Sequence, residues 1–359
     1  MTKPNSPGRN TWSTYQGQSR PSDPAKPAAT PAPATGPMVR LPAHLAVAQY
    51  RLTVEALDML DLPPFKTSAL RGGFGHTFKR LVCTRPYLCE AHCHLANDCP
   101  YGYIFETTPP QDSEVLRNFS EIPRPFIIQS ANDWRQKIPR GERLSFGLVL
   151  VGAAINHLSY FIAVFRELGR VGLGRTQGRY RLRAVEAIPF PGGDPMTIYE
   201  AETDTLRGLD TTIISSAIEA EAAHLAADRL TLSFLTPTRL KEQGRWINRG
   251  PEFQVVVRTL LGRLSSLSYF HCNERLDVDF RGLIDRAKTV EVAACDTYWE
   301  DWSRVSGRQK QRIEMGGLVG QVTYSGDLAP YRALLTLGEL IHVGKGTVFG
   351  NGQYRIGRG

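Results

Sequence analysis

The feature that most constrains this chain is its glycine-rich C-terminal end, Gly338–Arg358. Five of fifteen positions there are glycine (338, 344, 346, 350 and 352), and His342 and Lys345 lie among them. Glycine has no Cβ, so the backbone can adopt positive φ and approach a ligand closely. The segment has the pattern of a helix end, a loop and a short strand, 353–356. A phosphate-binding loop precedes its helix, whereas this loop follows one, and Lys345 is followed by glycine, so the pattern argues against a nucleotide-triphosphate site.

A similar ending occurs in the first half of the chain. Gly178–Leu182 (GRYRL) matches Gly352–Ile356 (GQYRI), and two further glycines, Gly172 and Gly174, lie just upstream of the first copy. Each copy follows a stretch of helical periodicity. A helix, a glycine-rich loop and a closing strand, used twice, indicate two copies of one supersecondary unit.

Hydrophobic periodicity extends this duplication to the order strand, helix, strand, strand, helix, strand in each half, which is the ferredoxin-like arrangement. In the first half we expect elements at 45–55, 69–82, 126–129, 144–151, 155–168 and 179–187. In the second half we expect them at 229–235, 252–267, 289–294, 318–324, 330–341 and 353–356. The predicted fold class is therefore α+β, with two tandem ferredoxin-like domains.

The predicted domain boundaries follow composition. Residues 1–42 are rich in Pro and Ala without hydrophobic periodicity, which predicts a disordered tail. The first domain is expected at 43–190, a connecting region at 191–228, and the second domain at 229–359.

The overall charge points to an anionic partner. The chain of 359 residues has a net charge of +8 and a pI near 9.2, which favours nucleic acid ahead of a membrane. No apolar run reaches the roughly 20 residues that cross a bilayer, and the N-terminus lacks the apolar core of a signal peptide. We therefore expect a cytoplasmic protein, in which six cysteines do not build a disulfide scaffold.

The predicted helix 69–82 carries a polar face opposite its apolar one. His76, Lys79 and Arg80 are spaced i, i+3 and i+4 and share that face. The same helix contains Gly72, Gly73 and Gly75, each of which costs roughly 1 kcal/mol relative to Ala inside a helix. Close approach of another backbone or of a ligand would offset that cost. The alternative is a solvated polar face with one incidental histidine.

A cysteine-rich segment follows this helix. Four cysteines lie within seventeen residues, together with two histidines: Cys83, Cys89, Cys93, Cys99, His92 and His94. Four thiolates can hold zinc tetrahedrally or bind an iron–sulfur cluster. We predict a structural metal site formed by the four cysteines, with zinc first and an iron–sulfur cluster second. The alternative is a set of buried or free thiols in a compact insertion.

A basic segment with interleaved aromatics lies between the second and third strands of the second half. It runs from Trp299 to Arg312 and contains Arg304, Arg308 and Lys310. This mixture suits an RNA backbone and its unstacked bases, although a solvated charged turn has the same composition. Arg175, in the first glycine loop, belongs to the same predicted RNA-binding set.

Two groups of residues carry a resemblance to a known family. The second-half residues are Arg308–Gln309, Gly316–Gly320, Gly326–Leu328 and His342–Tyr354, and together they resemble the CRISPR precursor-RNA processing endoribonucleases of the RAMP superfamily. Leu70–His76, followed by the cysteines, resembles the branch of that family with a cysteine-rich insertion. The resemblance covers residues 45–357 and leaves out only the N-terminal tail.

The resemblance implies two ferredoxin-like domains facing each other across a basic cleft, and cleavage of repeat RNA in a CRISPR transcript without a catalytic metal. In this chemistry the ribose 2′-OH attacks the neighbouring phosphate and leaves a 2′,3′-cyclic phosphate and a 5′-OH, which requires a base, an acid and cationic help. The family's histidine on the first helix is matched by His76, with Lys79 or Arg80 as the cation. His342 is the competing histidine.

The same resemblance implies the remaining contacts. Lys345 is expected at a phosphate, and the loop glycines Gly344, Gly346, Gly350 and Gly352 are expected to let backbone N–H groups reach the RNA. The implied partners are precursor CRISPR RNA and a CRISPR interference complex, with no membrane and no nucleotide cofactor. Two alternatives stay open: a non-catalytic RNA-binding RAMP subunit of a CRISPR effector complex, and an unrelated metal-containing RNA-binding protein.

Overall fold

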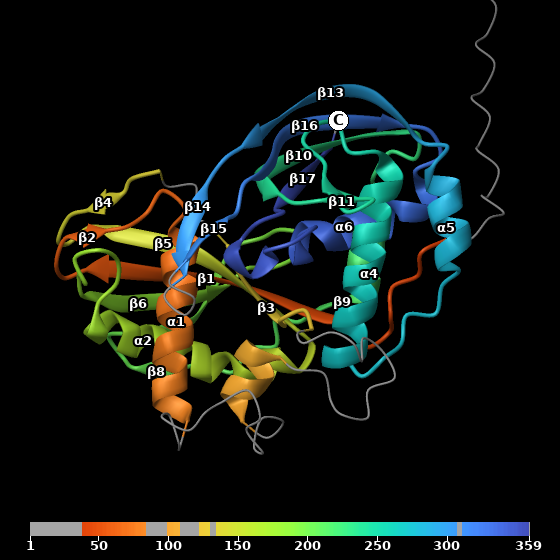
Figure 1. The fold of residues 1–359 in the computed structure, drawn as a ribbon. Helices are drawn as coiled ribbons and strands as arrows, with labels where there is room; N and C mark the ends of the chain where they lie inside the picture. Colours follow the sequence, from red (N-terminus) through yellow and green to blue (C-terminus); the bar gives the residue numbers. More distant parts are fainter. Residues whose placement is uncertain (1–37, 84–98, 108–121, 130–133, 307–310, 359) are drawn as a thin grey trace, which may run out of the picture. The chain divides into compact units, whose positions relative to one another are not determined.

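The first half of the chain forms a βαββαβ unit whose elements share one antiparallel sheet (Figure 1). Its elements are β1 (Ala46–Ala56), α1 (Lys66–Val82), β3 (Phe126–Gln129), β5 (Arg143–Val151), α2 (Leu158–Val171) and β6 (Tyr180–Ala187). The strand order is β3-β5-β1-β6. In β1 apolar and polar residues alternate, so Leu52 and Val54 are buried in the first core while Arg51 and Thr53 lie on the other face. The computed structural model describes residues 38–83, 99–107, 122–129, 134–306 and 311–358.

The second half repeats this topology (Figure 1). Its elements are β10 (Arg229–Thr238), α4 (Phe253–His271), β13 (Glu291–Glu300), β16 (Gly317–Ser325), α6 (Arg332–Ile341) and β17 (Tyr354–Gly357). The strand order β13-β16-β10-β17 is that of the first sheet, with the last strand beside the first. The prediction of two tandem ferredoxin-like domains in an α+β fold is confirmed.

The region predicted to connect the domains contributes to the first sheet. β7 (Met196–Glu200) pairs with β6, β8 (Thr205–Leu206) pairs with β7, and β9 (Ile213–Ile214) pairs with β1. The helix α3 (Ser215–Ala222) follows, and it packs against α6. The first sheet is therefore larger than the predicted four strands.

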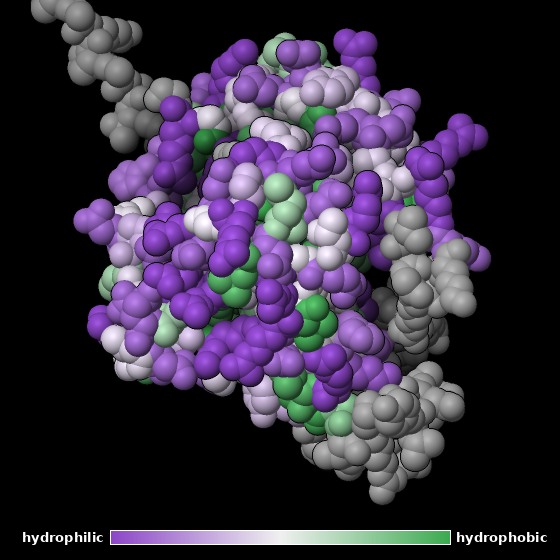
Figure 2. Space-filling model, turned by 90° about the vertical axis from the view of Figure 1, so that its left-hand side faces the viewer, coloured by the Kyte–Doolittle hydropathy of each residue, from purple (hydrophilic) through white to green (hydrophobic). Residues whose placement is uncertain are grey.

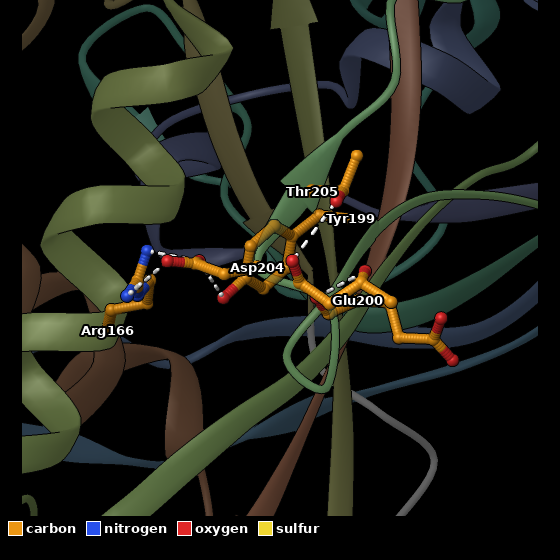
Figure 3. A network of polar contacts seen from close by, with 6 residues as sticks. Arg166, Tyr199, Glu200, Asp204 and Thr205 are labelled. Atoms are coloured by element: carbon orange, nitrogen blue, oxygen red, sulfur yellow. Dashed lines mark hydrogen bonds and ion pairs between the residues drawn. The ribbon is translucent and has the colours of Figure 1, made fainter.

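A polar network ties the β7–β8 turn to α2 (Figure 3). The Arg166 guanidinium donates to the Asp204 carboxylate at 2.7 Å, and the Tyr199 hydroxyl donates to the same carboxylate at 3.2 Å. Arg166 also lies 5.8 Å from the centroid of the Tyr199 ring. Both groups of the ion pair are substantially exposed, so it orients the turn more than it stabilises the fold.

Several short elements complete the described part of the chain. They are β2 (Leu60–Asp61), β4 (Lys137–Ile138), β11 (Lys241–Glu242), β12 (Arg245–Trp246), β14 (Ser303–Ser306), β15 (Gln311–Glu314), the helix α5 (Phe280–Ala287), and the single turns η1 (Gly102–Glu106), η2 (Gly152–His157), η3 (Ala329–Tyr331) and η4 (Thr347–Phe349). The β14–β15 pair is a hairpin that leaves the second sheet in the basic segment.

Two hydrophobic cores hold the domains, and the second one crosses the domain boundary. The first core lies between the first sheet and its helices α1 and α2. The second core contains the residues of α4 and α6 and also Val47, Ile127 and Val149 from the first sheet. The two ferredoxin-like domains therefore share buried apolar contacts. Burial of this kind stabilises an interface at roughly 25 cal/mol per Å² of apolar surface.

The surface is mainly hydrophilic on the side seen in Figure 2, where apolar residues lie in small separate groups. Among the residues that the structure describes, no helix combines the length and the apolar character needed to span a bilayer.

Candidate nucleic-acid interface

The helix α1 presents His76 on its exposed side. Leu70, Phe74 and Phe78 are buried on the opposite side, where the Phe74 ring stacks on Phe161 at 4.9 Å. His76 is exposed and Lys79 is half-buried, so the predicted polar face is where the helical spacing places it. The Arg80 guanidinium donates to the Glu167 carboxylate of α2 at 3.1 Å. Arg80 thus links two helices, whereas the His76 imidazole faces solvent.

The three glycines of α1 differ in what surrounds them. A Cβ at Gly73 would lie 2.8 Å from a methyl group of Leu168, and a Cβ at Gly75 would overlap the ring of Phe105. Both glycines therefore allow close packing within the protein. A Cβ at Gly72 would meet no atom within 4 Å among the residues that the structure describes. Packing against these residues gives no reason for glycine at this position.

The β14–β15 hairpin lies beside α1, which connects the basic segment to the helix that carries His76 (Figure 1). Trp302, just before β14, stacks on Phe65 at the start of α1, with ring centroids 4.4 Å apart. Arg304 of β14 lies 4.5 Å from the centroid of the Phe349 ring, and Arg71 of α1 lies 4.8 Å from the same centroid. The hairpin, the first helix and the second glycine loop therefore meet at Phe349.

Arg304 is a cation in a partly dry environment. Burial lowers the pKa of its guanidinium. Its Nε and the indole Nε1 of Trp302 are buried and have no hydrogen-bond partner within the described residues. Unpaired buried donors are costly, and an anionic acceptor would satisfy them. The other two predicted basic residues of the segment, Arg308 and Lys310, lie outside the described residues.

Arg71 and Phe349 had no predicted role. Both belong to the motifs Leu70–His76 and His342–Tyr354 that carry the family resemblance. Two arginines contact the same phenylalanine ring, and these residues come from both halves of the chain. A local sequence pattern therefore could not predict this contact.

The second glycine loop has the predicted backbone geometry, with φ of +91° at Gly344, +80° at Gly346, +79° at Gly350 and +75° at Gly352. The space around these glycines differs from the expectation. A Cβ at Gly344 would lie 2.6 Å from the carbonyl oxygen of Arg239, and one at Gly352 would overlap the carbonyl oxygen of Val343. At Gly344 and Gly352 the missing Cβ therefore accommodates the protein's own backbone, and Gly350 and Gly352 are buried.

Lys345 lies at the tip of this loop and is exposed, in agreement with a contact to a phosphate. Its backbone N–H donates to the carbonyl oxygen of Arg239 at 3.1 Å, which fixes the loop against the end of β10.

His342 lies in the protein interior, which differs from the expectation of a histidine facing RNA. Its side chain has no exposed surface. The Nδ1 atom lies 3.1 Å from the carbonyl oxygen of Asn351, and Nε2 lies 3.0 Å from the Nε2 amide nitrogen of Gln129 on β3. These partners require a neutral ring that donates from Nδ1 and accepts at Nε2. The imidazole therefore joins the second glycine loop to the first domain.

Burial lowers the pKa of His342 to about 3, and the nearby cations Arg263 and Arg355 act in the same direction. The hydrogen bond to Asn351 opposes this shift but does not cancel it. The backbone of His342, with φ +61° and ψ 165°, lies in a region that glycine favours. A strained, dry and neutral histidine is held by its surroundings and has no exposed surface through which to contact RNA.

A second buried histidine was not predicted. His271 ends α4, and its Nε2 lies 2.7 Å from the carbonyl oxygen of Pro123 while its Nδ1 lies 3.3 Å from the Tyr103 hydroxyl. Burial lowers the pKa of His271 to about 4. It joins a helix of the second domain to the segment that precedes β3, as His342 does for the second loop.

The first glycine loop carries Arg175, whose side chain is 86% exposed. Its guanidinium lies 3.9 Å from the Asp61 carboxylate, at the limit of an ion pair. A hollow of about 520 Å³ lies between this loop and α1. Arg175 is thus an exposed cation on the rim of a hollow.

The second half of the chain matches a known family. Residues 232–354 match the family model of the CRISPR-associated endoribonuclease Cas6. This half of the chain is therefore similar to the Cas6 endoribonucleases of the RAMP superfamily. Residues 44–211 match a second family model, AF_1859_N, described as an N-terminal domain.

Similar proteins cover most of the length of the chain. A protein of Archaeoglobus fulgidus, described as uncharacterized, is 26% identical over 326 residues, which are 89% of this chain and 97% of the relative. Among solved structures, a Cas6 product complex matches 86% of this chain and 98% of its own chain, at 15% identity and a TM-score of 0.50.

A partial Cas6-RT-Cas1–Cas2 complex matches 89% of this chain with a TM-score of 0.53 and 13% identity. The chain spans about half (47%) of that longer protein. At these identities the structures agree in fold, which supports the two tandem ferredoxin-like domains.

The cysteine-rich insertion, which the resemblance ascribes to one branch of this family, falls largely outside the described residues. Cys89 and Cys93 lie outside them. Cys83 follows α1 and Cys99 precedes η1, and both are half-buried free thiols. The ends of the insertion are anchored, since Phe78 of α1 contacts Tyr101 at 5.8 Å between ring centroids. Within the described residues no group of three or more metal-ligating side chains is present, so the four-cysteine site stays a prediction.

Proposed function

We propose that the chain is an endoribonuclease that cuts CRISPR repeat RNA in precursor transcripts and so produces guide RNAs. The observation that carries this proposal is the junction at Phe349, where the basic β14–β15 hairpin and the second glycine loop meet α1. α1 carries an exposed histidine, His76, and belongs to the other domain. A polyanion bound along the hairpin would pass close to an imidazole. The Cas6-type second half and the Cas6 fold support the same activity.

The proposed reaction needs no metal ion. The 2′-OH of one nucleotide attacks the adjacent phosphorus, the bond to the 5′ oxygen of the next nucleotide breaks, and the products carry a 2′,3′-cyclic phosphate and a 5′-OH. His76 takes the proton of the 2′-OH or supplies one to the leaving oxygen, since a positioned side chain of this kind contributes typically 10²–10⁴-fold. Lys79, one turn further along α1, stabilises the charge of the phosphorane.

The RNA contacts use the exposed cations and the half-buried Arg304. Arg304 and Lys345 bind phosphates near the junction, Arg175 binds one on the far side of α1, and Arg80 adds positive potential from its pair with Glu167. Arg308 and Lys310 extend the same basic segment. We assign His342 a structural role in place of the catalytic one, because its burial removes it from the surface that RNA contacts. Gly352 likewise shapes the loop from inside.

The partners we propose are precursor CRISPR RNA and, after cleavage, a CRISPR interference complex. The titles of two similar structures name a Cas6-RT-Cas1–Cas2 complex, which shows that a similar fold occurs within a CRISPR-associated assembly. The cysteine cluster is proposed as a structural zinc site with no part in the chemistry.

The test is cleavage of an RNA that carries the CRISPR repeat of the encoding genome, in the presence of EDTA. We expect one cut that leaves a cyclic phosphate, and no cut when the attacking nucleotide is 2′-deoxy. His76→Ala should slow the reaction by at least about 10²-fold and leave RNA affinity unchanged. His224→Ala is the matched control, because His224 is an exposed histidine that follows α3.

Each remaining outcome separates the alternatives. Tight binding of repeat RNA without any cut would contradict the proposal and support a non-catalytic RNA-binding subunit. Loss of RNA binding on metal removal, without cleavage beforehand, would support a metal-containing RNA-binding protein. Full activity of His76→Ala would assign the acid–base role to another group.

A further inference from the structure

The hollow between α1 and the first glycine loop has the features of a binding site. Its walls are Ala69 and Gly73 of α1 on one side and the first glycine loop, Gly172–Gln177, on the other, with Pro63 between them. Its volume of about 520 Å³ lies in the range of small-ligand sites, roughly 300–1,000 Å³. A single nucleotide fits a space of this size.

The loop wall is fixed by the protein itself. A Cβ at Gly174 would overlap the carbonyl oxygen of Asp61, and one at Gly178 would overlap that of Met59. The backbone N–H of Arg175 donates to the same Asp61 carbonyl at 2.9 Å, and the Thr176 hydroxyl donates to the Met59 carbonyl at 3.1 Å. The loop therefore presents a preformed surface, which lowers the entropic cost of binding.

The charge of the hollow selects an anion. Arg175 lies on its rim with 86% of its side chain exposed, and its pairing with Asp61 at 3.9 Å leaves most of the guanidinium to solvent. An exposed guanidinium binds a phosphate through two parallel hydrogen bonds. Gln177 adds a neutral amide, which can pair with the edge of a base.

The α1 wall leads directly to His76. Residues 72 and 73 lie three and four positions after residue 69, and residue 76 lies four and three positions after them, so the four residues share one side of the helix. Gly72 is next to Gly73 on this side, and a Cβ there would meet no atom of the described residues within 4 Å. Gly73 and Gly75 have packing partners that require glycine, whereas the described part of the chain offers none to Gly72. A ligand lying against the helix backbone at Gly72 explains why this costly residue is present.

We infer that this hollow is a subsite for the nucleotide next to the cleaved bond, with the sugar–phosphate backbone against Gly72 and one phosphate on Arg175. The inference rests on the proposed function and names where the RNA lies on the first domain. The RNA then contacts the part of α1 that precedes His76: the basic hairpin stacks at Phe65, and the first glycine loop lies along Ala69 and Gly73.

The first experiment replaces Gly72 by Ala and by Gln. The matched control is the same pair of substitutions at Gly262, which is also an exposed helical glycine whose Cβ would meet no atom within 4 Å. Both sites lose a helix-destabilising glycine, so all four variants should unfold at a temperature about 2 °C or more above wild type. Only the Gly72 variants should weaken binding of the repeat RNA, by about tenfold for Ala and more for Gln.

The second experiment pairs Arg175 with the RNA. Single methylphosphonate groups, which remove one negative charge, are placed at each phosphate flanking the cleaved bond. One of them should weaken binding to wild type by about tenfold and should have no effect on Arg175→Ala. Arg175→Ala should also reduce the slope of log K against log salt by about one contact.

Two results would overturn the inference while the proposed function stands. The first is wild-type RNA affinity and cleavage in Gly72→Gln. The second is a methylphosphonate profile that is the same for wild type and Arg175→Ala. Failure of the wild-type chain to bind or cut repeat RNA would refute the proposed function itself, and the inference with it.

Discussion

Substitution of His342 provides the sharpest test of the structure, because it distinguishes a buried structural histidine from a catalytic one. The ordinary pKa of 6.5 falls to about 3 in the folded chain, with burial as the main cause. Below pH 6.5 the His342 imidazole of the unfolded chain is therefore protonated, whereas that of the folded chain stays neutral. The stability that this histidine contributes is complete above pH 6.5 and is lost progressively as the pH falls toward 3.

The magnitude follows from the shift. For each pH unit below the unfolded pKa, a histidine that stays neutral in the folded chain lowers the free energy of unfolding by about 1.4 kcal/mol. At pH 5 one such histidine therefore lowers it by about 2 kcal/mol relative to pH 7.5. His271, whose pKa falls to about 4, loses a similar amount over the same interval. The two histidines together account for about 4 kcal/mol of acid destabilisation.

The variant His342→Gln removes the titrating group and keeps a neutral polar side chain. We expect it to lose about 1–3 kcal/mol of stability at pH 7.5, because Gln129 and the Asn351 carbonyl lose well-placed partners. Its further loss between pH 7.5 and pH 5 should be about 2 kcal/mol smaller than that of wild type. Urea unfolding at pH 7.5, 6 and 5 measures both quantities, and His271→Gln should repeat the effect.

The reasoning fails if His342→Gln and wild type lose the same free energy of unfolding between pH 7.5 and pH 5. Cleavage of repeat RNA gives an independent readout. The folded variant should cut within about tenfold of the wild-type rate at pH 7.5, whereas a general acid–base group would cost at least about 10²-fold.

Three further predictions concern the second glycine loop, the junction and the cysteines. Gly352→Ala should destabilise the chain by about 2 kcal/mol or more, because φ is +75° and a Cβ would overlap the Val343 carbonyl. The control Gly208→Ala, where a Cβ would meet no described atom within 4 Å, should stay near wild type. Equal thermal midpoints of the two variants would contradict this. Arg304→Ala should weaken RNA binding and lower its salt slope by about one, and an unchanged slope would show that this guanidinium contacts no phosphate. Protein purified without added metal should contain about one zinc per chain. The double variant Cys89→Ser, Cys93→Ser should lose this zinc and have a lower thermal midpoint, while its cleavage rate changes little. An unchanged metal content would exclude the site.

The fold was predictable because its main elements are long and periodic. The predicted strand 126–129 coincides with β3, and the predicted strand 144–151 lacks only the first residue of β5. The helix predicted at 252–267 continues to His271, since its last turn packs against the first domain. The topology was predictable because the two halves share one order of elements, so the assignment of each half supported that of the other.

The missed elements are short or depend on distant residues. β8 and β9 have two residues each, too few to show a period, and they exist because β7 and β1 offer them a partner. The burial of His342 depends on Gln129, which is 213 residues away along the chain. The stacking of Trp302 on Phe65 is likewise non-local, so the sequence left a solvated charged turn open beside an RNA-binding segment.

The exposed face of α1 was predictable from helical spacing, and the environment of its glycines was not. Spacing placed His76 and Lys79 on one side, where the structure has them. Three glycines within four residues looked equivalent in the sequence, and only the packing of Leu168 and Phe105 separates Gly72 from the other two.

The shared second core has a consequence for how this duplicated chain can be divided. Val47, Ile127 and Val149 belong to the first sheet, yet they are buried with the apolar residues of the second domain. A fragment ending near residue 211 would expose these side chains to water, and a fragment beginning near residue 229 would lose the surface that covers its helices. Although the halves share one topology, each buries apolar residues against the other, so we expect separate expression of the two halves to yield aggregating pieces.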